Sequence, residues 1–147
     1  MTDQNNTNNG IHLFADRMPD VPGLKLPPPV FELLGGEFLE TTETSMKARY
    51  PVRESYQNPF GYMQGGLLSA IMDNTIGPLS ILVAPPSVTT QFNTTYLRPV
   101  TPDDDHLIVV AELLERTRRQ LFFKATVYNP AGKIVCFCQA NHTVVGE

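Results

Sequence analysis

The sequence predicts an α+β fold in which an antiparallel sheet wraps one long central helix. Two observations lead to this prediction. The most apolar run, from Leu67 to Ala84, has the length and composition of a buried helix, although it contains Asp73 and Pro78. Strand-like segments lie on both sides of it, and the last three are joined by short turns, which favours antiparallel pairing. Strands segregated around one helix indicate an α+β domain.

The overall composition fits a single globular domain and argues against several classes of partner. The chain has 147 residues, which is enough to bury a core of its own. Its formal net charge of −4 argues against a nucleic-acid partner, because such proteins usually carry a basic excess. No cluster of lysine and arginine is long enough to indicate a membrane-binding surface. We therefore expect neither nucleic acid nor a membrane as a partner.

Residues 1–29 are expected to be disordered or irregular, and to precede a single domain at residues 30–147. The first ten residues, MTDQNNTNNG, contain almost no apolar side chain, which is typical of disorder. They also lack the basic region and the apolar run of a secretory signal. Residues 11–29 contain five prolines, which favour irregular structure.

The remaining elements are predicted from short local patterns. A short helix is expected from Val30 to Leu34, ending at Gly35-Gly36. Glu37 to Val52 should form two strands joined by a turn. Four strands should follow the central helix: Ser87 to Leu97, Leu107 to Arg116, Leu121 to Tyr128 and Lys133 to Val145. The sequence NPAG at residues 129–132 predicts the turn before the last strand.

The central helix should begin at the pair Gly65-Gly66 and carry one stripe of small and polar residues. At about 100° per residue, the stripe falls within an arc of about 120°. Its members are Gly65, Gly66, Ser69, Asp73, Ile76 and Gly77. Small residues leave room beside the helix, and Asp73 would place a carboxylate in that room. Pro78 should bend the far end of the helix.

Asp73 is the candidate for chemistry on this helix. A buried carboxylate without a partner is costly, and an ordinary core aspartate would hydrogen-bond to a neighbouring loop. The glycine pair favours a second interpretation, because the start of a helix presents unpaired N–H groups and partial positive charge. Such donors can polarise a carbonyl oxygen as an oxyanion hole does. Donors at the helix start and a carboxylate two turns on are the parts needed for acyl transfer to water.

The segment NPFGYMQGG, followed by six residues and then Asp73, resembles the PaaI-like acyl-CoA thioesterases of the hotdog superfamily. Their pattern is roughly N-x-x-G-x-x-H-G-G-(x6)-D/E. The sequence SVTTQFNTTYLRPV at residues 87–100 resembles the family's strand after the helix, and the turns at 117–119 and 129–132 also fit. The resemblance covers about Glu37 to Val145. It implies a hotdog fold, assembled as a dimer or tetramer with the site at the dimer interface.

The resemblance also implies catalytic roles for individual residues. Asp73 of one subunit would act as general base or as nucleophile, and both alternatives stay open. The Gly65 N–H of the other subunit would polarise the thioester carbonyl, and Asn58 would orient water or substrate. Thr89 lies close to where relatives place a hydroxyl that holds the water. Gln64 stands where the family usually has His, and it can exchange hydrogen bonds but cannot titrate.

Further residues are assigned to substrate contact. They are Gly66, Ser69, Thr90, Arg118 and Arg119. Thr90 is the alternative to Thr89, since loop lengths differ among relatives. The two arginines lie in a polar turn and could meet the phosphates of coenzyme A, although a solvated turn is the more ordinary explanation for at least one of them.

Other candidate groups have ordinary structural explanations. Asp103 to His106 is expected to be a solvated loop rather than a metal site, because consecutive aspartates do not converge easily on one ion. Cys136 and Cys138 alternate on one strand, where they make a poor disulfide, and this favours the reduced cytoplasm. His142 is expected at the rim of the fold. The hydratases that share this fold use a catalytic His, and no His lies on the central helix.

The sequence therefore predicts hydrolysis of an acyl-CoA thioester to a free acid and coenzyme A. No metal and no cofactor are expected, since coenzyme A is part of the substrate. The alternative is a non-catalytic hotdog module that binds acyl-CoA or another apolar ligand. Gln64 keeps this alternative open, because it replaces the histidine of the family pattern.

Overall fold

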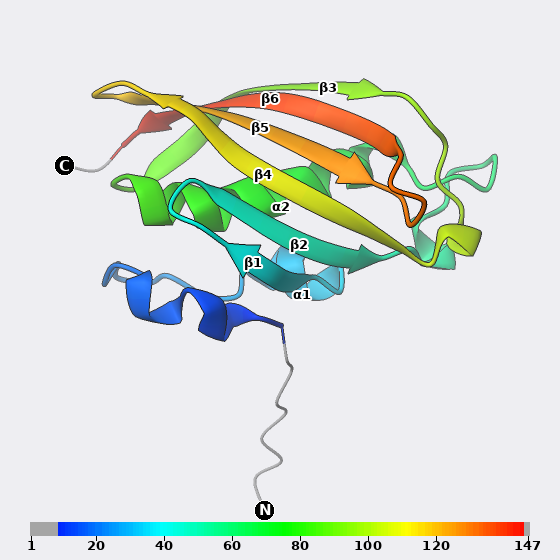
Figure 1. Ribbon diagram of the computed structural model, residues 1–147, viewed down its shortest axis with the longest axis horizontal. Helices are drawn as coiled ribbons and strands as arrows, with labels where there is room; N and C mark the ends of the chain where they lie inside the picture. The colour runs from blue at the N-terminus through cyan, green and yellow to red at the C-terminus, as the bar shows by residue number, and fades with distance from the viewer. Residues whose placement is uncertain (1–8, 146–147) are drawn as a thin grey trace, which may run out of the picture.

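The computed structural model describes residues 9–145, and its architecture is the predicted α+β hotdog fold (Figure 1). One six-stranded antiparallel sheet wraps the long helix α2 (Gly65–Val83). The strands are β1 (Glu37–Thr41), β2 (Ser45–Pro51), β3 (Ser87–Tyr96), β4 (His106–Arg116), β5 (Gln120–Tyr128) and β6 (Ile134–Val144). Their order in the sheet is β1-β2-β4-β5-β6-β3, so β1 and β3 form the two edges.

The elements agree closely with those predicted from local patterns. The short helix α1 (Pro29–Leu33) ends before the expected glycine pair, and the segment after it forms β1 and β2 joined by a turn. The four strands after α2 begin and end within one residue of their predicted limits. The alternation of apolar and polar residues carries this information, because it separates the face on α2 from the outer face.

Helix α2 begins at Gly65 as predicted and continues for five residues beyond Pro78. Its buried face packs against β2, β4 and β5. Ile76 is fully buried on this face, so its assignment to the polar stripe was wrong. Ile76 lies inside the predicted arc, about 20° from its Gly65 side, so the buried face of the helix extends into the arc at this position. Among the described residues α2 alone is long and apolar enough to cross a membrane, a test that core helices of globular domains also meet.

The described part of the N-terminal segment is irregular and packs on the fold. It contains two short 3-10 turns, η1 (Ile11–Leu13) and η2 (Ala15–Arg17). Phe14 is fully buried and meets the Phe38 ring edge to face, with centroids 4.9 Å apart. The Phe38 N–H donates to the Asn9 carbonyl, which covers part of the β1 edge. The predicted disorder of the first ten residues falls mostly on residues 1–8, outside the described part of the chain.

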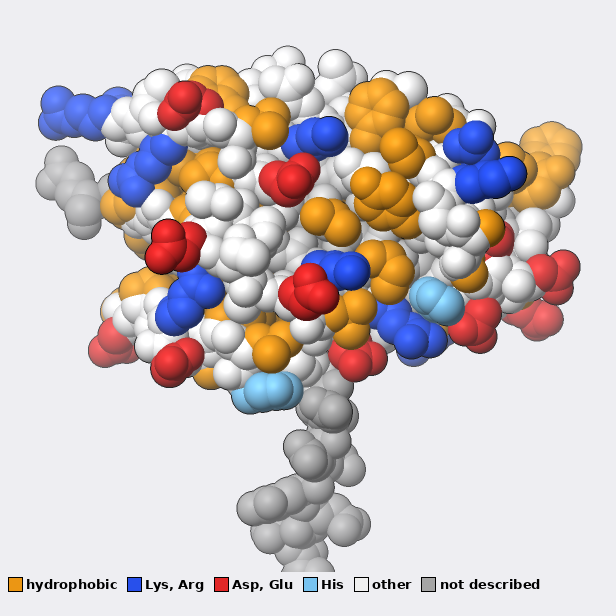
Figure 2. Space-filling model, viewed as in Figure 1, with side chains coloured by type: hydrophobic (Ala, Val, Ile, Leu, Met, Phe, Trp, Pro, Cys, Tyr) orange, Lys and Arg blue, Asp and Glu red, His pale blue; other side chains and the backbone are white. Residues whose placement is uncertain are grey.

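The two edges of the sheet differ in what covers them. The N-terminal segment packs along β1, whereas β3 is ten residues long and mostly exposed, with β6 on one side only. An exposed edge strand of this length is a template for pairing with another chain. The face of the sheet seen in Figure 2 mixes acidic, basic and apolar side chains and shows no broad patch of one charge.

Candidate active site

Asp73 lies on the face of α2 that the sheet leaves open. Its side chain is exposed in the single chain, whereas the neighbouring Met72 is fully buried. The sequence suggested a buried carboxylate, and this was wrong for the isolated chain because the sheet wraps only one side of the helix. Asp73 stands between two hollows, of about 550 Å³ and about 180 Å³. The room predicted beside the small residues of the stripe is therefore present.

A hydrogen-bonded chain of side chains reaches Asp73 from the sheet. The Thr89 hydroxyl donates to Asp73 Oδ1 over 3.3 Å and lies 3.1 Å from His142 Nε2. The other ring nitrogen, His142 Nδ1, lies 3.0 Å from Ser87 Oγ. Antiparallel pairing of β3 with β6 places Thr89 directly opposite His142. No hydrogen bond to Asp73 Oδ2 comes from the described residues, so this oxygen is open to a water molecule.

The roles within this chain follow from the acceptor at its end. An ionised carboxylate can only accept, so Thr89 donates its proton to Asp73 and can accept from His142 Nε2–H. His142 Nδ1 is then the acceptor for the Ser87 hydroxyl, which assigns the tautomer of the ring. Burial lowers the pKa of His142 below its ordinary value of 6.5, while the negative charge of Asp73 partly opposes this shift. The imidazole is therefore neutral near neutral pH.

His142 was expected at the rim of the fold, and this expectation was wrong. Its side chain is only 3% exposed and packs against the Phe123 ring, with centroids 5.0 Å apart. The alternation along β6 contained the signal, because Cys136, Cys138 and Ala140 at every second position are buried on the same face. Extending that alternation by two residues places His142 inward.

The structure separates Thr89 from the alternative Thr90. Only Thr89 faces Asp73, because the Thr90 hydroxyl donates to the Asn141 carbonyl and lies 3.2 Å from Thr143 Oγ1. The register between β3 and β6 shifts between Thr89 and Gln91, so Thr90 is the extra residue of a bulge. Thr90 therefore does not reach the carboxylate in the single chain.

The start of α2 forms a second cluster of candidate residues. The Gly65 N–H has no acceptor among the described residues, as expected for the first turn of a helix. The Tyr96 hydroxyl donates to the Gly65 carbonyl over 2.8 Å and lies 2.7 Å from Ser69 Oγ. A Cβ atom on Gly65 would lie 3.1 Å from Tyr96 Cζ, so glycine lets the tyrosine approach the helix closely. Tyr96 was not singled out from the sequence, because its contact with α2 depends on long-range pairing.

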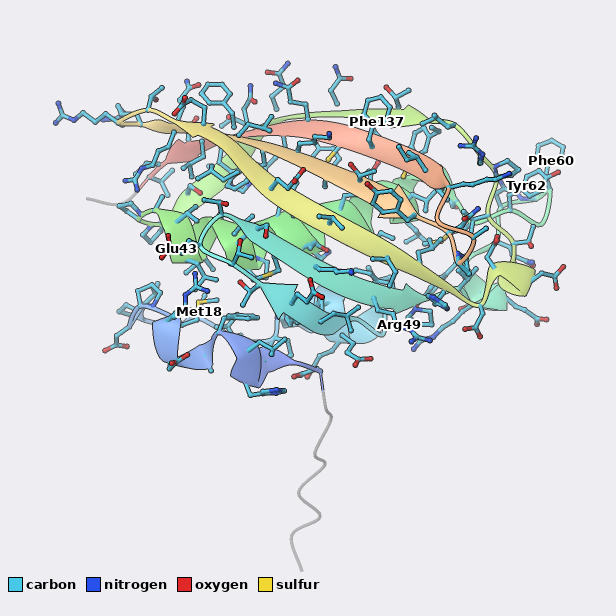
Figure 3. All side chains as sticks on the ribbon, viewed as in Figure 1. Met18, Glu43, Arg49, Phe60, Tyr62 and Phe137 are labelled. Carbon is cyan, nitrogen blue, oxygen red and sulfur yellow. The ribbon has the colours of Figure 1, made fainter. Side chains whose placement is uncertain are left out.

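Asn58 shapes the loop that leads into α2. Its Oδ1 accepts hydrogen bonds from the N–H groups of Phe60 and Tyr62, over 2.9 and 3.1 Å. The Phe60 and Tyr62 side chains project from this loop at one end of the molecule (Figure 3). Asn58 and Gly65 line a hollow of about 310 Å³ that does not include Asp73.

Within one chain the two clusters cannot act on the same atom. Gly65 and Asp73 are eight residues apart on one helix, which corresponds to about 12 Å at the helical rise. The predicted division of the site between two subunits would overcome this separation.

Gln64 caps the helix with its backbone carbonyl, which accepts the Leu67 and Leu68 N–H groups, and its side chain is exposed. Gly66 is exposed, and a Cβ atom there would meet nothing within 4 Å.

The remaining candidates lie away from Asp73. Arg118 and Arg119 are exposed in the turn between β4 and β5, and the Arg119 carbonyl accepts the Val144 N–H. Burial raises the pKa of Cys136 to about 12 and that of Cys138 to about 11, which makes both thiols poor nucleophiles. Over residues 9–145 no three His, Cys, Asp or Glu side chains gather as a metal site would require.

Comparison with known proteins gives consistent results. A model of the thioesterase superfamily matches residues 60–136. Human acyl-coenzyme A thioesterase 13 is 30% identical over 95 residues, which span 63% of this chain and 66% of that protein, slightly under two thirds. The E. coli PaaI protein from the phenylacetic acid degradation operon superimposes with a TM-score of 0.76 at 16% identity, over 82% of this chain and 86% of that chain.

A hypothetical thioesterase of Streptococcus pneumoniae was solved with coenzyme A. It superimposes with a TM-score of 0.72 at 23% identity, over 76% of this chain and 87% of that chain. Variants of this protein with alanine in place of one aspartate and of one threonine, sixteen positions apart, share the same fold. At these identities the solved structures show a common fold.

Proposed function

This chain is a hotdog-fold member of the thioesterase superfamily, and we propose that it hydrolyses acyl-CoA thioesters to a free acid and coenzyme A. One observation carries the proposal. On the open face of α2, Asp73 is held through Oδ1 by Thr89, while none of residues 9–145 donates a hydrogen bond to Oδ2, which leaves that oxygen for water. This is the arrangement that activation of a water molecule beside a bound thioester requires.

The comparisons support acyl-CoA as the substrate class. The human relative is named for this activity, and the pneumococcal protein binds coenzyme A. The aspartate and threonine varied in the pneumococcal protein are sixteen positions apart, and Asp73 and Thr89 are separated by the same number of positions. The proposed reaction uses coenzyme A as part of the substrate and calls on no metal or other cofactor.

In the proposed reaction Asp73 acts as general base or as nucleophile. As a base, it takes a proton from water through Oδ2 while the water oxygen attacks the thioester carbonyl. As a nucleophile, it forms a mixed anhydride that water then opens. In both routes the C–S bond breaks, and the coenzyme A thiolate takes up a proton. The Thr89 hydroxyl fixes the rotamer of the carboxylate in either case.

The second half of the proposed site comes from another subunit. We propose a dimer, or a tetramer built from dimers, in which exposed β3 edges pair and bring the start of one α2 toward Asp73 of the partner. The free Gly65 N–H would then stabilise the charge that develops on the carbonyl oxygen. Asn58 would orient the substrate or water beside it. We also propose that the protein acts in the reducing cytoplasm.

Thiol release from a panel of acyl-CoA substrates tests the proposed function. The panel spans acetyl-CoA, octanoyl-CoA, palmitoyl-CoA and phenylacetyl-CoA, and free thiol is measured with a chromogenic reagent. Turnover of at least one member above the Asp73→Asn background supports hydrolysis. Tight binding of several members without turnover would instead support a binding module, the function that Gln64 in place of the family histidine keeps open.

A further inference from the structure

The larger hollow beside Asp73 has a wall that comes from the N-terminal segment. Residues 23–29, here called the strap, close one side of this cavity of about 550 Å³. Helix α2 forms a second side, and the start of β3 together with His142 forms a third.

The strap is attached to the rest of the domain by specific contacts. Upstream, Phe14 is buried in the core and Arg17 Nη2 donates to the Thr42 carbonyl over 3.2 Å. Downstream, the strap leads directly into α1, whose Phe31 stacks on Phe38 with ring centroids 4.1 Å apart. The segments on both sides of the strap are therefore anchored, at Arg17 and at α1, and the strap connects them across this side of the cavity.

The cavity is lined by polar and apolar side chains together. Its polar lining includes Asp73 and Thr89 as well as Lys25, Asn74, Ser80, Ser87 and His142. Its apolar lining includes Leu24 and Leu26 of the strap and Pro78 and Ile81 of α2. A volume of this size falls in the range of small-molecule sites, which are mostly apolar with a few polar groups that fix orientation. An apolar group attached to a carbonyl at Asp73 could contact these apolar side chains within the same cavity.

We propose that the strap and the far half of α2 bind the aliphatic acyl chain of the substrate, and that Leu24 and Leu26 determine which acyl groups are accepted. This inference rests on the proposed function and adds the acyl class to it. The substrate carbonyl lies at Asp73 and its hydrocarbon chain extends between the strap and Ile81. The coenzyme A part of the bound substrate extends to the other side of Asp73, toward the smaller hollow lined by Ser69 and Phe92.

Gly77 offers a direct way to fill the cavity. It lines the cavity one helical turn beyond Asp73, and a Cβ atom there would meet nothing within 4 Å. Gly77 precedes Pro78, so a Cβ atom there makes the helical conformation less favourable, but the added side chain enters open space, and we expect Gly77→Leu to fold with reduced stability, with circular dichroism as the check. We expect the ratio of kcat/KM for octanoyl-CoA to that for acetyl-CoA to fall at least about tenfold, since hydrophobic pockets discriminate on that scale. Gly77→Ala should give a smaller fall. An unchanged ratio would overturn the proposal.

A second measurement detects binding without turnover. The chain contains no tryptophan, so Leu26→Trp in the Asp73→Asn background introduces a single fluorescent reporter at the strap. Leu33→Trp in the same background is the matched control, because Leu33 is 72% exposed and does not line the cavity. Octanoyl-CoA should shift the emission of the Leu26→Trp variant, while free coenzyme A should not.

The outcomes separate this inference from the proposed function. If the emission of the Leu26→Trp variant shifts with octanoyl-CoA and not with free coenzyme A, the acyl site is supported even when the wild type hydrolyses no member of the panel. An equal response to free coenzyme A would assign the cavity to coenzyme A and overturn the inference. No response to octanoyl-CoA, in a variant that still binds it by calorimetry, would also overturn it and leave the proposed hydrolysis intact.

Discussion

At the residue scale, the hydroxyl of Thr89 stands between a carboxylate and an imidazole. It donates to Asp73 Oδ1 and accepts from His142, so the hydroxyl proton of Thr89 is oriented toward the carboxylate. In the neutral imidazole that donates from Nε2 to Thr89, Nδ1 is left to accept a hydrogen bond from the Ser87 hydroxyl. Burial of His142 keeps the ring neutral, and the chain of hydrogen bonds thereby fixes the carboxylate without adding a charge.

Asp73→Asn should lower kcat by about 10²–10⁴-fold, the usual contribution of a general base. The amide is nearly isosteric, and its oxygen can still accept from Thr89, so folding and ligand binding should persist. Steady-state kinetics on the best acyl-CoA, with circular dichroism as the control for folding, measures this. A near wild-type rate would show that the carboxylate assignment is mistaken.

The two mechanisms differ in what happens to the carboxylate oxygens. In a single turnover in heavy-oxygen water, only the anhydride route can leave label in the protein. Mass spectrometry of the peptide that contains Asp73 distinguishes the routes. Label reaches the protein when water attacks Cγ of the anhydride, because the labelled oxygen then replaces Oδ2, which leaves with the free acid, while Oδ1 keeps its hydrogen bond from Thr89.

His142 should make folding stability depend on pH. Because its pKa is lowered in the folded state from 6.5, the unfolded chain binds a proton below about pH 6.5 that the folded chain does not. Stability is therefore fully present above this pH and is lost as pH falls toward the folded pKa. His142→Gln should flatten the fall in Tm between neutral and mildly acidic pH. An identical pH profile in both proteins would contradict the assignment.

The sequence predicts some of these residues and not others, for a physical reason. Asp73 and Thr89 were predicted because they fall within a local motif and a strand that follows it. Ser69 was assigned to the substrate; in the single chain its hydroxyl lies within hydrogen-bond distance of the Tyr96 and Thr94 hydroxyls, and the assignment stays a prediction. Tyr96 and His142 depend on which strands pair and in what register, and this information is not present in any short segment.

At the scale of elements, the first turn of α2 is the part that local chemistry defines best. Gln64 has φ −61° and ψ 135°, and Gly65 follows as the first helical residue. The region around the glycine pair was predicted as a helix start from composition alone. The sheet was predicted as segments, whereas its order, with β3 beside β6 and β1 at the other edge, comes only from the structure.

A pair of substitutions at Gly65 isolates its N–H group. Proline is tolerated at the first helical position, and Gln64 already has the extended conformation that a following proline requires. Gly65→Pro therefore removes the donor, and Gly65→Ala adds a similar Cβ atom near Tyr96 while keeping it. We expect Gly65→Pro to lower kcat by about 10²–10³-fold relative to Gly65→Ala, the usual effect of one oxyanion donor. Equal activities would exclude the N–H as that donor.

At the scale of the whole molecule, one sheet edge is protected and the other is open. The N-terminal segment covers part of β1, and its approach requires Gly10, where a Cβ atom would clash with the Phe38 carbonyl oxygen. The β3 edge has no such cover among the described residues. Association should therefore use β3, and it would also bring a second chain over the open face of α2.

The shared site makes a prediction about mixed dimers. In a dimer of Asp73→Asn chains both sites lack the carboxylate, and in a dimer of Gly65→Pro chains both lack the N–H donor. A hybrid of the two has one doubly defective site and one intact site. The intact site combines Asp73 from the Gly65→Pro chain with Gly65 from the Asp73→Asn chain.

Co-expression of the two variants, each with its own affinity tag, should therefore restore activity. With random pairing, about one quarter of wild-type activity is expected per chain, because about half of the dimers are hybrids with one working site of two. Tandem affinity purification isolates the hybrid, which should reach about half of the wild-type rate per dimer. Each variant mixed with itself is the control. If the hybrid is no more active than its parents, and light scattering confirms a dimer, then Asp73 and Gly65 do not meet across the interface.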